Sequence, residues 1–103
     1  MPVWSVQIVP GTGSGSPAVF IAQNQPTAPP GTVYADPNDA ISWDNTTAQN
    51  HELQTTSSPI TPLGGLVTPR HQTSAWIVTG NSGTLISYAC LIHPAETGTI
   101  SVT

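Results

Sequence analysis

Proline and glycine interrupt this chain so often that long helices have little room to form. Eleven prolines and nine glycines are spread over 103 residues. Five of these breakers fall within residues 56–70 alone, too many for a helix beyond one turn. Strong helix formers such as Lys, Arg, Glu and Met are scarce, whereas Val, Ile, Thr, Tyr and Trp, which favour strands, are plentiful. The sequence therefore predicts an all-β fold.

Several short runs between the breakers have the pattern of strands, because they alternate apolar and polar residues or are short, apolar and bounded by turn residues. These predicted strands cover residues 3–9, 18–22, 32–34, 40–44, 74–79, 84–90 and 98–103. No strand is predicted in residues 56–70. The number and regular spacing of the runs indicate a β-sandwich or a β-barrel.

The size and charge of the chain limit both its organisation and its partners. A length of 103 residues predicts one domain over residues 1–103. The single basic residue, Arg70, stands against five acidic residues, and this excludes nucleic acid as a partner, because neutralising phosphates requires a basic patch. No segment approaches the roughly 20 apolar residues of a membrane-spanning helix. The first residues also lack the basic and apolar regions of a signal peptide.

The composition argues against disorder and leaves open how so small a domain is stabilised. The chain is 37% apolar and only 6% charged, whereas disordered chains usually combine low hydrophobicity with high net charge. Cys90 is the only cysteine, so an internal disulfide is excluded. A bound metal ion is then one candidate for the stabilising element.

Cys90 and two histidines form a candidate metal-binding group. Cys90 ends a predicted strand and His93 follows three residues later, a spacing at which both side chains can reach one ion. His51 follows the predicted strand 40–44 and a polar loop, and it supplies a second imidazole. Two imidazoles with one thiolate are the ligands of blue-copper sites, whereas zinc usually takes four such ligands. The alternatives are a buried structural thiol and a loop histidine bonded to backbone.

Three segments resemble the cupredoxins, the small blue copper proteins that include plastocyanin and amicyanin. Residues 39–45, followed by His51, resemble the strand, asparagine and first copper histidine of that family. Residues 83–90 resemble its Gly-Thr-x-x-Tyr-x-Cys strand, and residues 93–102 resemble its ligand loop and last strand. The resemblance spans nearly the whole chain. It implies a Greek-key β-sandwich of about seven or eight strands that holds one mononuclear copper ion.

Two carboxylates depart from the cupredoxin pattern. Glu96 stands where the resemblance implies an axial methionine, and Met1 is the only methionine in the chain. A carboxylate oxygen is harder than a thioether and favours Cu(II), so Glu96 is expected to lower the reduction potential if it is a ligand. The alternative is a solvated loop acid. Glu52 stands where the family often has an asparagine that ties two loops together, and it is expected to bring a second carboxylate near the copper.

The resemblance implies a function as well as a fold. It implies one-electron transfer by a copper ion held by His51, Cys90, His93 and Glu96, in a carrier that is not an enzyme. A redox donor and a redox acceptor are expected to dock on an apolar patch near His93. The candidate patch residues are Leu63, Leu66, Leu91, Ile92 and Pro94.

Other properties follow from the same resemblance, and two further functions remain open. A monomer in the periplasm or outside the cell is expected. One alternative function is a copper carrier or sensor, in which the carboxylates serve metal loading. The other is a cupredoxin-like structural or interaction module without a metal. His71 is predicted to be an exposed turn residue without a role.

Overall fold

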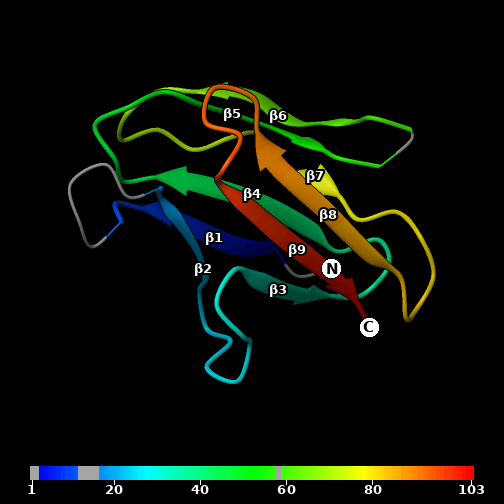
Figure 1. The fold of residues 1–103 in the computed structure, drawn as a ribbon. Helices are drawn as coiled ribbons and strands as arrows, with labels where there is room; N and C mark the ends of the chain where they lie inside the picture. The colour runs from blue at the N-terminus through cyan, green and yellow to red at the C-terminus, as the bar shows by residue number, and fades with distance from the viewer. Residues whose placement is uncertain (1–2, 12–16, 58) are drawn as a thin grey trace.

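The computed structural model describes residues 3–11, 17–57 and 59–103, which form two β-sheets packed face to face (Figure 1). These segments contain nine strands and no helix. The strands are β1 (Val3–Val9), β2 (Val19–Ala22), β3 (Thr32–Ala35), β4 (Ala40–Asn45), β5 (His51–Thr55), β6 (Pro62–Val67), β7 (Trp76–Ile77), β8 (Leu85–Cys90) and β9 (Thr97–Val102). None of the described segments is therefore a helix of the length and apolarity needed to cross a membrane.

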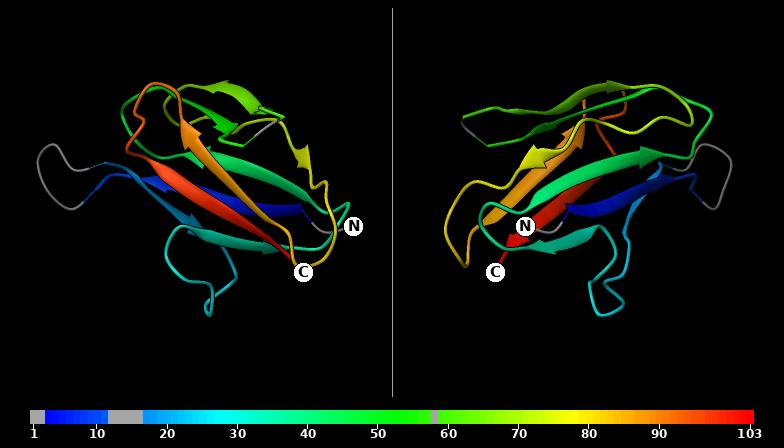
Figure 2. Two further views of the ribbon diagram at one scale, coloured as in Figure 1. Left: turned by 45° about the vertical axis from the view of Figure 1, so that its right-hand side comes forward. Right: turned by 180° about the vertical axis from the view of Figure 1, so that it is seen from behind.

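The connectivity confirms the predicted sandwich. One sheet has the strand order β2-β1-β4-β7 and the other β3-β9-β8-β5-β6. The chain crosses from one sheet to the other several times, so strands that are distant in sequence become neighbours: β1 lies parallel to β4, and β3 lies parallel to β9. The remaining pairs of strands are antiparallel. Figure 2 shows the two sheets from two further directions, one of them from behind. The arrangement is a Greek-key sandwich with nine strands in place of seven or eight.

Alternate residues of the strands point into one shared core. Trp43 and Tyr88 lie at its centre and are 0% and 1% exposed. Their rings meet edge to face with centroids 5.4 Å apart, and Trp43 Nε1 donates a hydrogen bond to Tyr88 Oη at 3.2 Å. Burial raises the pKa of the Tyr88 hydroxyl above its ordinary value, so the group is neutral at any physiological pH. These aromatic contacts hold the two sheets together.

Gly98 on β9 leaves the space that the Tyr88 ring occupies. A Cβ atom at this position would lie 2.4 Å from Tyr88 Cζ, which is closer than packing allows. We expect Gly98→Ala to lower the free energy of unfolding by about 2–3 kcal/mol, because the ring has to move within a close-packed core. Urea unfolding measures this loss. The exposed neighbouring change Thr97→Ala should cost less than about 0.5 kcal/mol, and equal losses for the two variants would contradict the expected overpacking.

The sequence prediction missed two strands, β5 and β6, and β6 lies within the breaker-rich residues 56–70. β6 is an edge strand of its sheet and Pro62 is its first residue, a position where the missing N–H of proline is tolerated. Gly64 has a φ of 91°, and a Cβ atom there would lie 2.5 Å from Thr73 Cβ. The breakers in this segment therefore serve an edge strand and a close approach between two segments. The predicted strand at 74–79 is also shorter than expected, since β7 has only two residues.

One end of the sandwich brings together the residues singled out from the sequence. β8 ends at Cys90 and β9 begins at Thr97, and the loop between them lies at the end of the sandwich away from the start of β1 and the end of β9 (Figure 1). Because β5 runs antiparallel to β8, with Leu53 opposite Cys90, the start of β5 at His51 lies at this same end. We call this end the metal end.

Candidate metal centre

Four donor atoms at the metal end lie within 4.8 Å of one another, and they belong to His51, Cys90, His93 and Glu96. Cys90 Sγ lies 3.7 Å from the Nδ1 atom of His51 and 3.7 Å from that of His93. Glu96 Oε1 lies 3.0 Å from the first of these nitrogens and 3.3 Å from the second. The fold thus brings all four predicted site residues to one point.

Three of these side chains are buried and the fourth reaches the surface. His51, Cys90 and Glu96 are 0%, 1% and 3% exposed. The interpretation of Glu96 as a solvated loop acid is therefore wrong. The His93 side chain is 31% exposed, so it connects the buried donor atoms with the surface.

The hydroxyl of Thr47 selects the tautomer of His51. Thr47 Oγ1 lies 2.8 Å from His51 Nε2 and donates its own proton to Asn45 Oδ1 at 2.7 Å. The hydroxyl therefore accepts from Nε2–H, which leaves the lone pair of Nδ1 facing the other donor atoms. Burial also lowers the pKa of His51, against an opposing effect of Glu96. The imidazole thus remains neutral, as a metal ligand must, to a lower pH than usual.

Thr47→Val should weaken metal binding because it removes the acceptor that holds His51 in this tautomer while nearly preserving side-chain volume. We expect a loss of Cu(II) affinity of about 10–100-fold, as is typical when a group that orients a metal-bound histidine is removed. Competition with a chelator measures the affinity. Thr47→Ser keeps the hydroxyl and should restore most of the binding. Wild-type affinity in the valine variant would show that Thr47 does not orient His51.

Backbone hydrogen bonds hold the loop that carries His93 and Glu96. Cys90 N donates to Glu96 O at 3.0 Å, and Glu96 N donates to His93 O at 2.9 Å. A further backbone hydrogen bond connects this loop to the segment that carries His51: Leu91 N donates to Glu52 O at 2.7 Å. The side chain of Glu52 lies on the face of β5 opposite to the buried His51. Glu52 is therefore not one of the four converging donors.

Within the described part of the chain, one oxygen of the Glu96 carboxylate has no hydrogen-bond partner. Oε2 accepts from Ala18 N at 2.8 Å, whereas the buried Oε1 has no hydrogen-bond partner among the described residues. Burying a carboxylate oxygen without a partner costs free energy. A cation at the point where the four donor atoms converge would offset this cost. Two imidazole nitrogens, one thiol and this oxygen therefore fit a transition-metal ion.

Four of the five candidate docking-patch residues are exposed. Leu91 and Ile92 are each 48% exposed, and Leu66 is 54% exposed. Pro94 is also exposed, so these four candidate patch residues are at the surface. The fifth, Leu63, is 0% exposed and belongs to the core, so its assignment to the patch is wrong.

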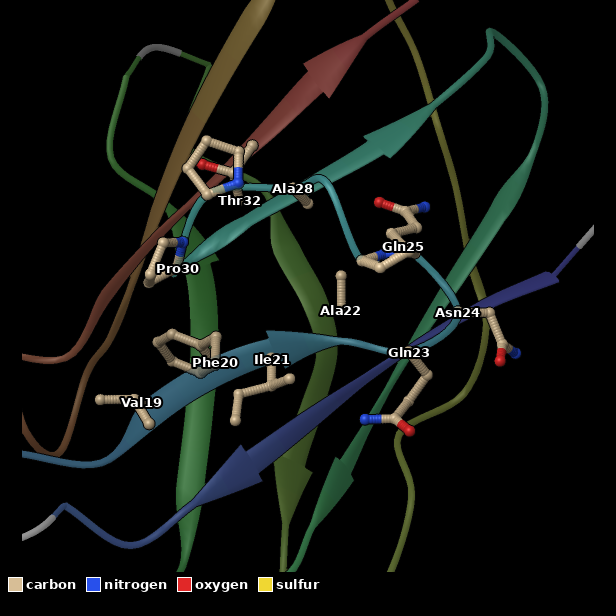
Figure 3. A pocket seen from close by; sticks show the side chains of 12 residues that line it. Val19, Phe20, Ile21, Ala22, Gln23, Asn24, Gln25, Ala28, Pro30 and Thr32 are labelled. Carbon is tan, nitrogen blue, oxygen red and sulfur yellow. The ribbon is translucent and has the colours of Figure 1, made fainter.

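Two other features lie apart from the four donors. His71 is exposed and is bonded within its own turn, where its Nδ1 lies 2.9 Å from Thr68 Oγ1 and 3.0 Å from Pro69 O. A hollow of about 580 Å³ lies beside β2 and is lined by residues 19–26, 28–30 and 32 (Figure 3). Its lining contains no ionisable side chain. Neither feature adds a donor to the metal centre.

Comparison with known proteins places the fold. No protein-family model matches the sequence, and no curated protein matches it. Solved structures of amicyanin are similar over 71% of this chain and 70% of theirs. They include a Cu(I) form of a methionine-to-alanine variant (TM-score 0.58, 17% identity), an oxidised methionine-to-lysine variant (0.59, 17%) and a reduced tryptophan-to-tyrosine variant (0.59, 16%). The chain therefore has the cupredoxin β-sandwich fold of amicyanin.

Proposed function

We propose that this chain binds one copper ion through His51, Cys90, His93 and Glu96 and carries single electrons between redox proteins. The observation that supports the proposal is the convergence of one thiol and two imidazole Nδ1 atoms in a largely buried site. A soft thiolate combined with imidazoles suits copper. A bound copper ion would supply the one-electron chemistry, by alternating between Cu(II) and Cu(I).

The protein's own residues would provide a fixed and mostly dry site. The donors of His51 and Cys90 come from adjacent strands, and the loop that carries the other two is held by its backbone hydrogen bonds. Such a framework limits rearrangement when the charge of the site changes. The side chain of His93, which is 31% exposed, is the proposed route for the electron between the buried donors and the surface.

The proposed docking surface for redox partners consists of the exposed side of His93 and the exposed apolar side chains of Leu91 and Ile92, which precede it in the chain. Charged residues make up only 6% of the chain. Association through this surface should therefore depend weakly on ionic strength. In keeping with the resemblance to cupredoxins, we propose that the chain acts as a monomer in the periplasm or outside the cell.

A Cu(II) titration of the purified chain tests the copper proposal. We expect an intense visible absorption from thiolate-to-copper charge transfer that saturates at one equivalent. We also expect a higher melting temperature, because an ion that binds only the folded state stabilises it. A colourless mixture with an unchanged melting temperature would contradict the proposal and favour a metal-free interaction module.

The buried carboxylate of Glu96 favours a second candidate, a copper carrier, because a hard oxygen ligand binds Cu(I) less well than Cu(II). Voltammetry of the loaded chain separates the two functions. A reversible one-electron wave with the copper retained supports electron transfer. Release of copper on reduction supports the carrier.

A further inference from the structure

The two oxygens of Glu96 lie in different surroundings. Oε1 faces the Nδ1 atoms of His51 and His93, whereas Oε2 accepts a hydrogen bond from the Ala18 amide at 2.8 Å. Ala18 directly precedes β2 of one sheet, and Glu96 lies in a loop between two strands of the other. This one hydrogen bond thus connects residues 78 positions apart in sequence across the two layers at the metal end.

We propose that the Ala18 N–H is a positioning group for Glu96, which holds Oε2 so that Oε1 faces the point where the four donors converge. This inference rests on the proposed copper function and adds to it a group that is not itself a ligand. The Ala18 amide is the one hydrogen-bond donor to this carboxylate within the described segments. The sole Lys or Arg residue of the sequence, Arg70, is exposed.

The orientation of the carboxylate depends on this bond for a physical reason. The last torsion of a glutamate side chain is soft, with broad minima. A charge-assisted hydrogen bond to one oxygen restricts that torsion and offsets part of the cost of burying the charge. A backbone amide is a suitable donor, because the strand that begins at residue 19 fixes its position. Without the amide, the carboxylate would lose both its orientation and its one donor.

Ala18→Pro tests the inference by removing the N–H, and Ala28→Pro is the matched control. The Ala28 amide also donates a hydrogen bond, to Gln25 O at 3.1 Å, but it lies in a loop that contributes none of the four donors. We expect Ala18→Pro to lower Cu(II) affinity by about 10–100-fold and to change the electron paramagnetic resonance spectrum of the bound ion. The control should keep the wild-type affinity and spectrum.

A second variant tests the same N–H without a proline, in case Ala18→Pro does not fold. Replacing Ala18 by lactic acid changes only the amide to an ester, in a chain assembled by ligation at the Ala89–Cys90 junction. The ester should show the same loss of affinity and the same spectral change as the proline variant. Wild-type binding by the ester variant would overturn the inference.

A double variant separates positioning from a general structural role. In a Glu96→Met background the amide has no carboxylate to hold, so Ala18→Pro should cause no further change in Cu(II) affinity. An equal loss in both backgrounds would overturn the inference. Failure of the wild-type chain to bind copper would instead overturn the proposed function, and the inference with it, before any substitution is made.

The metal-free protein provides an independent readout. The sequence contains only two glutamates, Glu52 and Glu96, so ¹³C labelling of glutamate gives two side-chain carboxyl signals, which Glu52→Gln assigns. Ala18→Pro should shift the Glu96 signal and leave the Glu52 signal in place. An unchanged Glu96 signal in a folded variant would contradict the proposed hydrogen bond.

Discussion

Cys90→Ala is expected to abolish the visible absorption of the copper-loaded chain. The absorption requires the thiolate, and Cys90 Sγ lies 3.7 Å from the Nδ1 atom of each histidine at the centre of the site. Cu(II) affinity should fall by more than the roughly 10–100-fold typical of losing a group that merely supports a ligand. Absorption and chelator competition measure the two effects.

Because Cys90 is the only cysteine, a thiolate ligand in the wild-type chain can come from this residue alone. Ser87→Ala, at an exposed position on the same strand, should keep the wild-type colour and affinity and serves as the control. Since Cys90 is the only thiol, its reactivity toward a thiol reagent should also fall when copper is added to the wild-type chain. A coloured one-to-one complex in the alanine variant would show that the thiolate is not a ligand.

Glu96→Met should raise the reduction potential of the bound copper. A thiolate and a carboxylate together balance the charge of Cu(II), but they leave a net negative charge in a buried site once the ion is reduced, which is unfavourable. Methionine removes one of these charges and supplies a softer donor that suits Cu(I). For a one-electron couple a hundredfold loss of preference for Cu(II) corresponds to a rise of about 120 mV. Voltammetry of the two loaded proteins measures the difference.

The other glutamate provides the control for this shift. Glu52→Gln removes the same charge one residue from His51 but on the opposite face of β5. Its effect on the reduction potential should be much smaller, because the Glu52 carboxylate is not proposed as a ligand and solvent screens its charge from the copper ion. A potential that moves no further in Glu96→Met than in Glu52→Gln would remove Glu96 from the coordination sphere.

Much of the fold follows from residue patterns that act locally. The alternation in residues 40–44 and the apolar run ending at Cys90 predict β4 and β8 within one residue of their observed bounds. The strand β6 escaped prediction because Pro62, Gly64 and Gly65 normally interrupt a strand. Here tertiary context outweighs their local preference, since an edge position tolerates the proline and the approach of Thr73 favours a glycine.

The ligands of the site are more predictable from the sequence than the groups that orient them. A thiol and imidazoles have distinctive chemistry, so the spacing of Cys90 and His93 already indicated one shared ion. The burial of Glu96 was open, because burial depends on how the loop packs against the other sheet. The Ala18 amide has no signature at all in a sequence, since every non-proline residue carries the same group. Thr47 is visible only once its distance to His51 Nε2 is known.

X-ray absorption at the copper edge of the wild-type chain, loaded with one equivalent of Cu(II), addresses the coordination most directly. We expect one sulfur and two imidazole nitrogens around the ion, which would come from Cys90, His51 and His93. A spectrum that contains only nitrogen and oxygen neighbours would contradict copper ligation by the thiolate, and with it the proposed electron carrier.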